Sequence, residues 1–92
     1  MPRLSESEIQ SALKAIPAWT VVNAKLHREM KFADFAYAFS FMTRAALAAE
    51  SMGHHPEWTN VYNRVTIDLT THDAGGISAK DFALAAKLDE LV

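Results

Sequence analysis

Residues 33–52 contain neither glycine nor proline and are rich in good helix formers, and this stretch constrains the fold of the chain most strongly. Two adjacent apolar stripes run along it at helical spacing. The first stripe consists of Phe35, Phe39, Met42, Ala46 and Ala49, and the second of Phe41, Ala45, Ala48 and Met52. An apolar band this wide faces more than one neighbour, and its alanines permit close approach of another helix or a sheet. We therefore predict one long helix that ends at Gly53, a residue well suited to a left-handed C-terminal cap.

Two shorter helices are predicted near the ends of the chain. Ser5 and Glu8 have the spacing of a capping box, and apolar residues then recur at helical intervals until Pro17. Ser78 and Asp81 repeat the capping pattern before a last helix whose leucines face the core.

Four short segments between these helices have the branched, aromatic and alternating residues of strands. They span residues 19–22, 26–31, 58–62 and 65–71, with turns at 23–25 and 63–64. The order helix, hairpin, helix, hairpin, helix predicts a single α+β domain over residues 1–92. In that domain a four-stranded antiparallel sheet is covered by helices on one face.

Composition excludes several classes of function. The formal net charge of −2 combines 9 basic with 11 acidic residues, and the basic residues form no block, so direct contact with DNA or RNA is not expected. The absence of cysteine excludes disulfides, thiolate metal ligands and a cysteine nucleophile. No apolar run approaches a membrane span, and the N-terminus has no signal-peptide core, so we expect a cytoplasmic protein without membrane contact. Hydrophobic residues make up 50% of this short chain, which favours a homo-oligomer.

Chemistry-bearing side chains gather between Glu50 and Trp58, where His54 and His55 precede a proline. The residue before a proline is extended, and neighbouring side chains on extended backbone point to opposite sides, so the two histidines have different roles. Glu50, four residues before His54, is close enough to orient an imidazole or to bind substrate. The second hairpin returns His72 to the same place.

Three interpretations of this cluster stay open on these grounds alone. His54, His72 and a carboxylate are ligand types of a zinc site, although their spacing matches no compact zinc pattern. The same residues fit polar side chains that cap a helix end and a loop. They also fit acid–base catalysis or ligand binding, because the unperturbed pKa of histidine is about 6.5.

The order of these residues resembles the signature of the pterin-4a-carbinolamine dehydratase family. The signature consists of Glu50, His54-His55-Pro56, Tyr62, His72 and Asp81 at their spacings in this chain. Residues 39–44, 55–63 and 69–73 also look like that family. The resemblance covers essentially the whole chain and shows no departure at a signature position.

The resemblance implies an enzyme that converts 4a-hydroxytetrahydrobiopterin to quinonoid dihydropterin and water, with no metal and no organic cofactor. It also implies a functional link to an aromatic amino acid hydroxylase, whose pterin cofactor is recycled. His54 and His72 are the expected acid–base groups, a role that typically contributes about 10²–10⁴-fold in rate. His55 is expected chiefly to position substrate, and Glu50 to orient the cluster or to contact the pterin.

Further signature and neighbouring residues complete the expected site. Pro56, Glu57 at the rim, Trp58 as a pocket wall and Asp81 form the rest of the predicted substrate-binding set. For Asp81, helix capping is favoured over substrate contact. Tyr62 is expected in the core.

The resemblance also leaves a second class of function as an alternative. Members of the family act as protein-interaction modules, either as a transcription coactivator or as an assembly factor. The intact histidine set argues for retained catalysis. For assembly, the family implies a dimer or a tetramer built from dimers, which is consistent with the alanine-rich band on the long helix.

Overall fold

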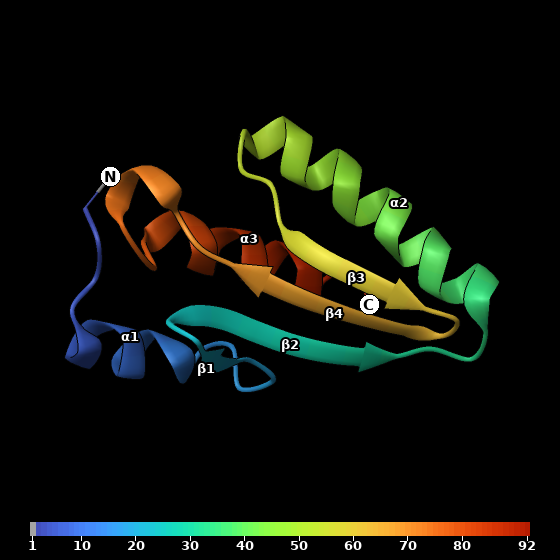
Figure 1. The fold of residues 1–92 in the computed structure, drawn as a ribbon, viewed down its shortest axis with the longest axis horizontal. Coiled ribbons are helices and arrows are strands. Elements are labelled where there is room, and N and C mark those ends of the chain that lie inside the picture. Colours follow the sequence, from blue (N-terminus) through green and yellow to red (C-terminus); the bar gives the residue numbers. More distant parts are fainter. Residues whose placement is uncertain (1) are drawn as a thin grey trace.

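The computed structural model describes residues 2–92 of the chain. Its elements are α1 (Glu6–Leu13), β1 (Thr20–Val22), β2 (Lys25–Lys31), α2 (Phe35–Met52), β3 (Glu57–Val61), β4 (Arg64–Leu69), the 3-10 turn η1 (His72–Ala74) and α3 (Ala79–Asp89) (Figure 1). These elements confirm the predicted α+β class. No helix in residues 2–92 combines the length and the hydropathy needed to cross a bilayer.

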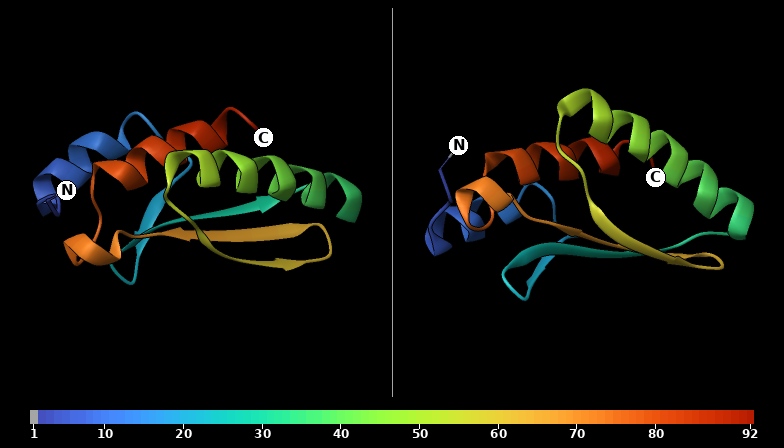
Figure 2. Two further views of the ribbon diagram at one scale, coloured as in Figure 1. Left: turned by 90° about the horizontal axis from the view of Figure 1, so that it is seen from above. Right: turned by 45° about the horizontal axis from the view of Figure 1, so that its top comes forward.

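The four strands form one antiparallel sheet in the order β1-β2-β4-β3, which confirms the predicted sheet. The two central strands, β2 and β4, come from different halves of the chain. Leu26 pairs with Leu69 and Met30 with Val65, and all four side chains are buried. Figure 2 shows the three helices together on one face of the sheet, and no helix of residues 2–92 lies on its other face.

The loop between β3 and β4 corrects one prediction. Val61 pairs with Arg64, so only Tyr62 and Asn63 connect the strands. A two-residue connection of this kind requires left-handed backbone, and Tyr62 has a φ of 50°. Its side chain is 63% exposed, so the prediction that Tyr62 lies in the core is wrong.

The core lies between the helices and the sheet, and α2 contributes a narrow face to it. The buried residues of α2 are Ala38, Phe41, Ala45 and Ala49. Within the predicted apolar band, Phe35 and Phe39 face outward and are 48% and 53% exposed. The alanines let α2 approach the sheet closely, and Phe41 fills the remaining space beside Phe32, with ring centroids 5.2 Å apart.

Two helix ends fix the backbone around the histidines. Gly53 ends α2 in the left-handed conformation, with a φ of 64°, and the amide of His54 donates to the carbonyl of Ala49 at 3.1 Å. At the start of α3, Ser78 and Asp81 form the predicted capping box. These two ends face each other across the end of the sheet.

Candidate functional site

Antiparallel pairing brings the parts of the histidine cluster together. Glu57, at the start of β3, pairs with Asp68 near the end of β4, so the residues just before β3 lie beside those just after β4. A cavity of about 280 Å³ opens there. Its lining consists of Gly53, His54, His55, Glu57, Thr70, Thr71, His72, Asp73 and Lys80. All three histidines of the predicted site therefore share one cavity.

His54 is the buried member of the cluster, and a carboxylate of α3 holds its ring. Its Nε2 lies 2.5 Å from Oδ1 of Asp81, which is fully buried. The other oxygen of Asp81, Oδ2, accepts the hydroxyl of Thr71 at 2.8 Å and the amide of Ser78 at 2.9 Å. The capping role predicted for Asp81 is therefore present, and the same side chain also contacts His54.

A chain of hydroxyl groups extends this network. The amide of Lys80 donates to Oγ of Ser78 at 3.2 Å, and the hydroxyls of Ser78 and Thr71 lie 2.6 Å apart. Because the Thr71 hydroxyl donates to Asp81, the Ser78 hydroxyl is the donor to Thr71. Each hydrogen bond in the network is thus donated in the direction of the Asp81 carboxylate, which acts only as an acceptor. This favours the tautomer of His54 in which Nε2 carries the proton and donates it to Asp81. The nitrogen that Asp81 does not engage is Nδ1.

His55 lies on the opposite side of the backbone from His54. Its Nε2 contacts Oε1 of Glu50 at 2.7 Å, and the two side chains are 66% and 78% exposed. The imidazole next to Glu50 is therefore that of His55. The left-handed turn at Gly53 is the cause, since it directs His54 toward α3 and leaves His55 above the last turn of α2.

His72 begins η1 and is exposed. It lines the histidine cavity and also a neighbouring cavity of about 360 Å³. Within residues 2–92 the ring of His72 makes no hydrogen bond. Its two nitrogens are thus accessible to a bound molecule.

Of the remaining predicted site residues, Glu57 lines the histidine cavity, whereas Pro56 and Trp58 do not. Glu57 lines both cavities and pairs with Lys25 at 2.5 Å. Pro56 and Trp58 are not among the described residues that line the histidine cavity. Trp58 packs against the core, because its position in β3 pairs with the buried Ile67, and its place as a pocket wall stays a prediction.

Sequence reasoning did not select Thr71 or Lys80 for the site. Thr71 is the buried residue just before His72, and Lys80 is in the first turn of α3. The signal for Thr71 was the capping box itself, since a buried cap carboxylate needs further donors. Lys80 offered no such signal, because its amide donates to Ser78 and not to the carboxylate. No buried side-chain polar atom in residues 2–92 lacks a hydrogen-bond partner.

The fourth histidine belongs to a separate cluster on the uncovered face of the sheet. His27 contacts Asp68 through Nδ1 at 2.8 Å and Glu29 through Nε2 at 3.0 Å. The hydrogen bond with Glu29 and then the one with Asp68 raise the pKa of His27 above its ordinary value. These contacts leave only 17% of the His27 side chain exposed.

The described part of the chain, residues 2–92, contains no group of three histidine or acidic side chains placed to hold a metal ion. In the histidine cavity, Nε2 of His54 is already engaged by Asp81, and Glu50 engages His55. The carboxylates of Asp81 and Glu50 are therefore bonded to the rings of His54 and His55, while the ring of His72 has no hydrogen-bond partner in residues 2–92. This arrangement suits proton transfer to and from a bound molecule.

Residues 2–91 match the family model described as pterin 4 alpha carbinolamine dehydratase. A protein of Solibacter usitatus, provisionally named a pterin-4-alpha-carbinolamine dehydratase, is 79% identical over 89 residues, which cover 97% of this chain and 94% of that protein. A protein of Rhodospirillum rubrum with the same provisional name is 50% identical over 92 residues, covering 98% of this chain and 96% of its own.

Solved structures show the same likeness. The crystal structure of a transcriptional coactivator/pterin dehydratase from Brucella melitensis has a TM-score of 0.93 and 45% identity, and the match covers 97% of each chain. A pterin dehydratase-like protein, identified as a RuBisCO assembly factor in the alpha-carboxysome, has a TM-score of 0.66 and 23% identity over 79% of this chain and 84% of its own. The latter likeness shows a shared fold alone.

Proposed function

Because the chain belongs to the pterin 4 alpha carbinolamine dehydratase family, we propose that it dehydrates a 4a-hydroxytetrahydropterin to the quinonoid dihydropterin. The observation that carries this proposal is the placement of His54, held by a buried carboxylate, in one cavity with His72. The reaction breaks the bond between C4a and the hydroxyl oxygen and forms a double bond between C4a and N5. It therefore needs a proton for the leaving oxygen and an acceptor for the proton on N5.

His54 suits the role of the base. The Asp81 carboxylate holds the proton on Nε2, so Nδ1 carries the lone pair that accepts the N5 proton. The imidazolium that forms stays paired with Asp81, whose negative charge is buried and close. This arrangement follows the same logic as the aspartate–histidine pair of serine hydrolases, in which the carboxylate fixes the tautomer and stabilises the charged ring.

His72 suits the role of the acid. Its exposed ring can exchange protons with solvent and then protonate the departing hydroxyl, which leaves as water. Lys80, in the lining of the same cavity, adds a positive charge near the developing oxygen charge. His55, held by Glu50, and Glu57 at the rim then position the pterin ring.

The substrate that fits this proposal arises when an aromatic amino acid hydroxylase oxidises tetrahydropterin. The dehydration leaves the oxidation level unchanged and gives the quinonoid dihydropterin, which a separate reduction returns to tetrahydropterin as part of tetrahydrobiopterin recycling. The hydroxylase link rests on the family to which the chain belongs, together with the three histidines retained in the cavity.

The test is stopped-flow decay of freshly generated 4a-hydroxytetrahydropterin in the presence of the wild type, His54→Ala or His72→Ala. We expect the wild type to accelerate decay and each variant to lose about 10²–10⁴-fold of that acceleration. A wild-type protein that leaves the spontaneous rate unchanged would remove the enzymatic proposal. Loss of activity with EDTA and its return with zinc would instead contradict a metal-free mechanism.

A protein-interaction role is the second candidate, and the outer face of α2 favours it. Phe35, Phe39 and Leu47 are 48%, 53% and 68% exposed on that face. We propose that a second copy of the chain covers it in a dimer or a tetramer, because large apolar side chains gathered on one helix face mark an interface. Failure of the dehydration assay, with self-association retained, would favour the interaction role.

A further inference from the structure

The loop that carries His72 is closed at its base by an antiparallel bridge. The amide of Thr71 donates to the carbonyl of Gly76 at 3.0 Å, and the amide of Gly76 donates to the carbonyl of Thr71 at 3.3 Å. Residues 72–75 form the loop between them, and His72 is its first residue. Because the ring of His72 has no hydrogen-bond partner in residues 2–92, the backbone of this loop sets the place from which the ring extends.

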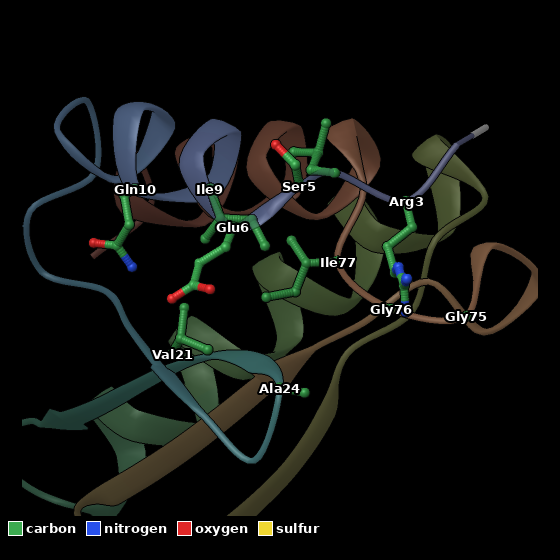
Figure 3. A pocket seen from close by; sticks show the side chains of 11 residues that line it. Arg3, Ser5, Glu6, Ile9, Gln10, Val21, Ala24, Gly75, Gly76 and Ile77 are labelled. Carbon is green, nitrogen blue, oxygen red and sulfur yellow. The ribbon is translucent and has the colours of Figure 1, made fainter.

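The residues just before α1 pair with the chain that leaves this loop. Arg3 forms an antiparallel bridge with Ser78, and the amide of Leu4 donates to the carbonyl of Ile77 at 2.8 Å. This pairing fixes the backbone of Arg3, so its side chain starts from a defined place beside the loop. Figure 3 shows that side chain reaching to Gly76.

The aliphatic stem of Arg3 packs directly on Gly76. A Cβ at position 76 would lie 2.7 Å from Cδ and 3.2 Å from Cγ of Arg3, so the stem occupies the place that a side chain would take. Arg3 is otherwise exposed, and its guanidinium makes no ion pair with a carboxylate of residues 2–92. The stem therefore covers one side of the backbone at the base of the loop. A backbone hydrogen bond shielded from water in this way is electrostatically stronger than an exposed one.

We propose that Arg3 is a positioning residue for His72, because its stem on Gly76 holds the loop closed and keeps the imidazole of His72 in the histidine cavity. The inference rests on the proposed function, in which His72 protonates the departing hydroxyl. The base, His54, is held by Asp81 of α3. The acid instead depends on a contact from the N-terminal residues, which do not line the histidine cavity.

Loss of the stem should change the rate more than it changes binding. A displacement of about 1 Å in a reacting group can cost about 10²-fold in rate. In the stopped-flow assay we therefore expect Arg3→Ala to lower kcat about 10- to 10²-fold. KM should change little, because every residue that lines the histidine cavity is retained.

Arg3→Met separates the stem from the charge. Methionine keeps Cγ and places Sδ where Cδ lies, but it has no guanidinium, so this variant should retain the wild-type kcat. A loss as large as that of Arg3→Ala would assign the effect to the charge and overturn the proposal. Lys14→Ala is the matched control, because it removes another exposed cation, at the end of α1 and outside the lining of the histidine cavity. It should also keep the wild-type kcat.

Gly76→Ala tests the same contact from the side of the loop. Its Cβ would displace the stem of Arg3, and Gly76 is not among the glycines with a positive φ, so alanine adds no backbone strain there. Both single variants remove one shared contact, so their losses in kcat should not multiply in the double variant. A double variant whose loss equals the product of the two single losses would overturn the proposal.

Nuclear magnetic resonance of the imidazole rings separates this inference from the proposed function, because it needs no substrate. In Arg3→Ala the ring signals of His72 should shift or broaden, while those of His27 on the uncovered face of the sheet stay in place. Unchanged His72 signals in the folded variant, checked by urea unfolding, would overturn the inference and leave the proposed function intact. A wild type that does not accelerate decay would remove the proposed function and the positioning role of Arg3 together. A loss of kcat in Arg3→Ala that Arg3→Met restores, with displaced His72 signals, supports the inference.

Discussion

Replacement of Asp81 by asparagine gives the sharpest test of how the site works. An asparagine can keep its carbonyl oxygen toward the amide of Ser78 and the hydroxyl of Thr71, so the cap of α3 survives. Its amide nitrogen then faces Nε2 of His54, 2.5 Å from the oxygen that it replaces. Since the amide donates, Nε2 must accept, and the ring proton moves to Nδ1.

The change of tautomer removes the proposed base, while the side chains that line the site stay in place. With a proton on Nδ1, His54 has no lone pair for the N5 proton, and we expect kcat to fall about 10²–10⁴-fold. That loss corresponds to about 3–5 kcal/mol in the activation barrier. The buried network keeps most of its bonds, so the free energy of unfolding should fall by only about 1–3 kcal/mol. Because the cavity is unchanged in shape, KM should change little.

Stopped-flow kinetics and urea unfolding of Asp81→Asn measure both effects. Glu8→Gln is the matched control, because Glu8 occupies the same capping-box position in α1, where its carboxylate accepts the amide of Ser5 at 2.8 Å. The control alters a cap far from the histidines and should retain full activity. A folded Asp81→Asn protein with wild-type kcat would refute the proposed tautomer control of His54.

Three further outcomes are expected. Hydrogen bonds with Glu29 and then with Asp68 raise the pKa of His27 in the folded protein. The protonated ring therefore stabilises the fold fully at pH values below the unfolded pKa of about 6.5, and this stabilisation is lost as pH rises through the folded pKa. Over that window the unfolding free energy of the wild type should fall relative to His27→Gln in urea titrations, and parallel curves would contradict the assignment. Gly53→Ala should lower the free energy of unfolding by about 1–2 kcal/mol in the same titrations, because the left-handed backbone is strained for alanine while its Cβ meets nothing within 4 Å. An unchanged free energy of unfolding would show that the turn is not held at that conformation. Phe39→Glu should shift the sedimenting species toward the 10.2 kDa monomer, and a wild type that is already monomeric at micromolar concentration would remove the proposed interface on α2.

Local signals were sufficient for the helices and the sheet. The two capping boxes and Gly53 set helix ends through contacts within a few residues, so sequence spacing was enough to place them. Strand ends were harder, because they depend on pairing across the sheet. Tyr62 illustrates this limit: alternation placed it on a strand, whereas the Val61–Arg64 pair closes the sheet one residue earlier.

The sequence was enough to predict which residues form the site, but not which side chains bond to one another within it. The separation of His54 from His55 follows from Pro56 and could be read from the sequence. The partner of each ring could not, because it depends on the angle at which α2 ends. The left-handed turn at Gly53 directs His54 to Asp81 of a distant helix and leaves Glu50 to His55.

The two roles considered for Asp81 are compatible because they use different atoms. Oδ2 takes the cap amide of Ser78 and the hydroxyl of Thr71, while Oδ1 takes the ring of His54. Capping fixes the carboxylate before any ligand arrives, so His54 is oriented by the same bonds that begin α3. A shift of the helix start by one residue would therefore remove the partner of His54 together with the cap. The proposed base is thus positioned by one of the most buried polar groups of the fold, whereas His72 stays exposed to exchange protons with solvent.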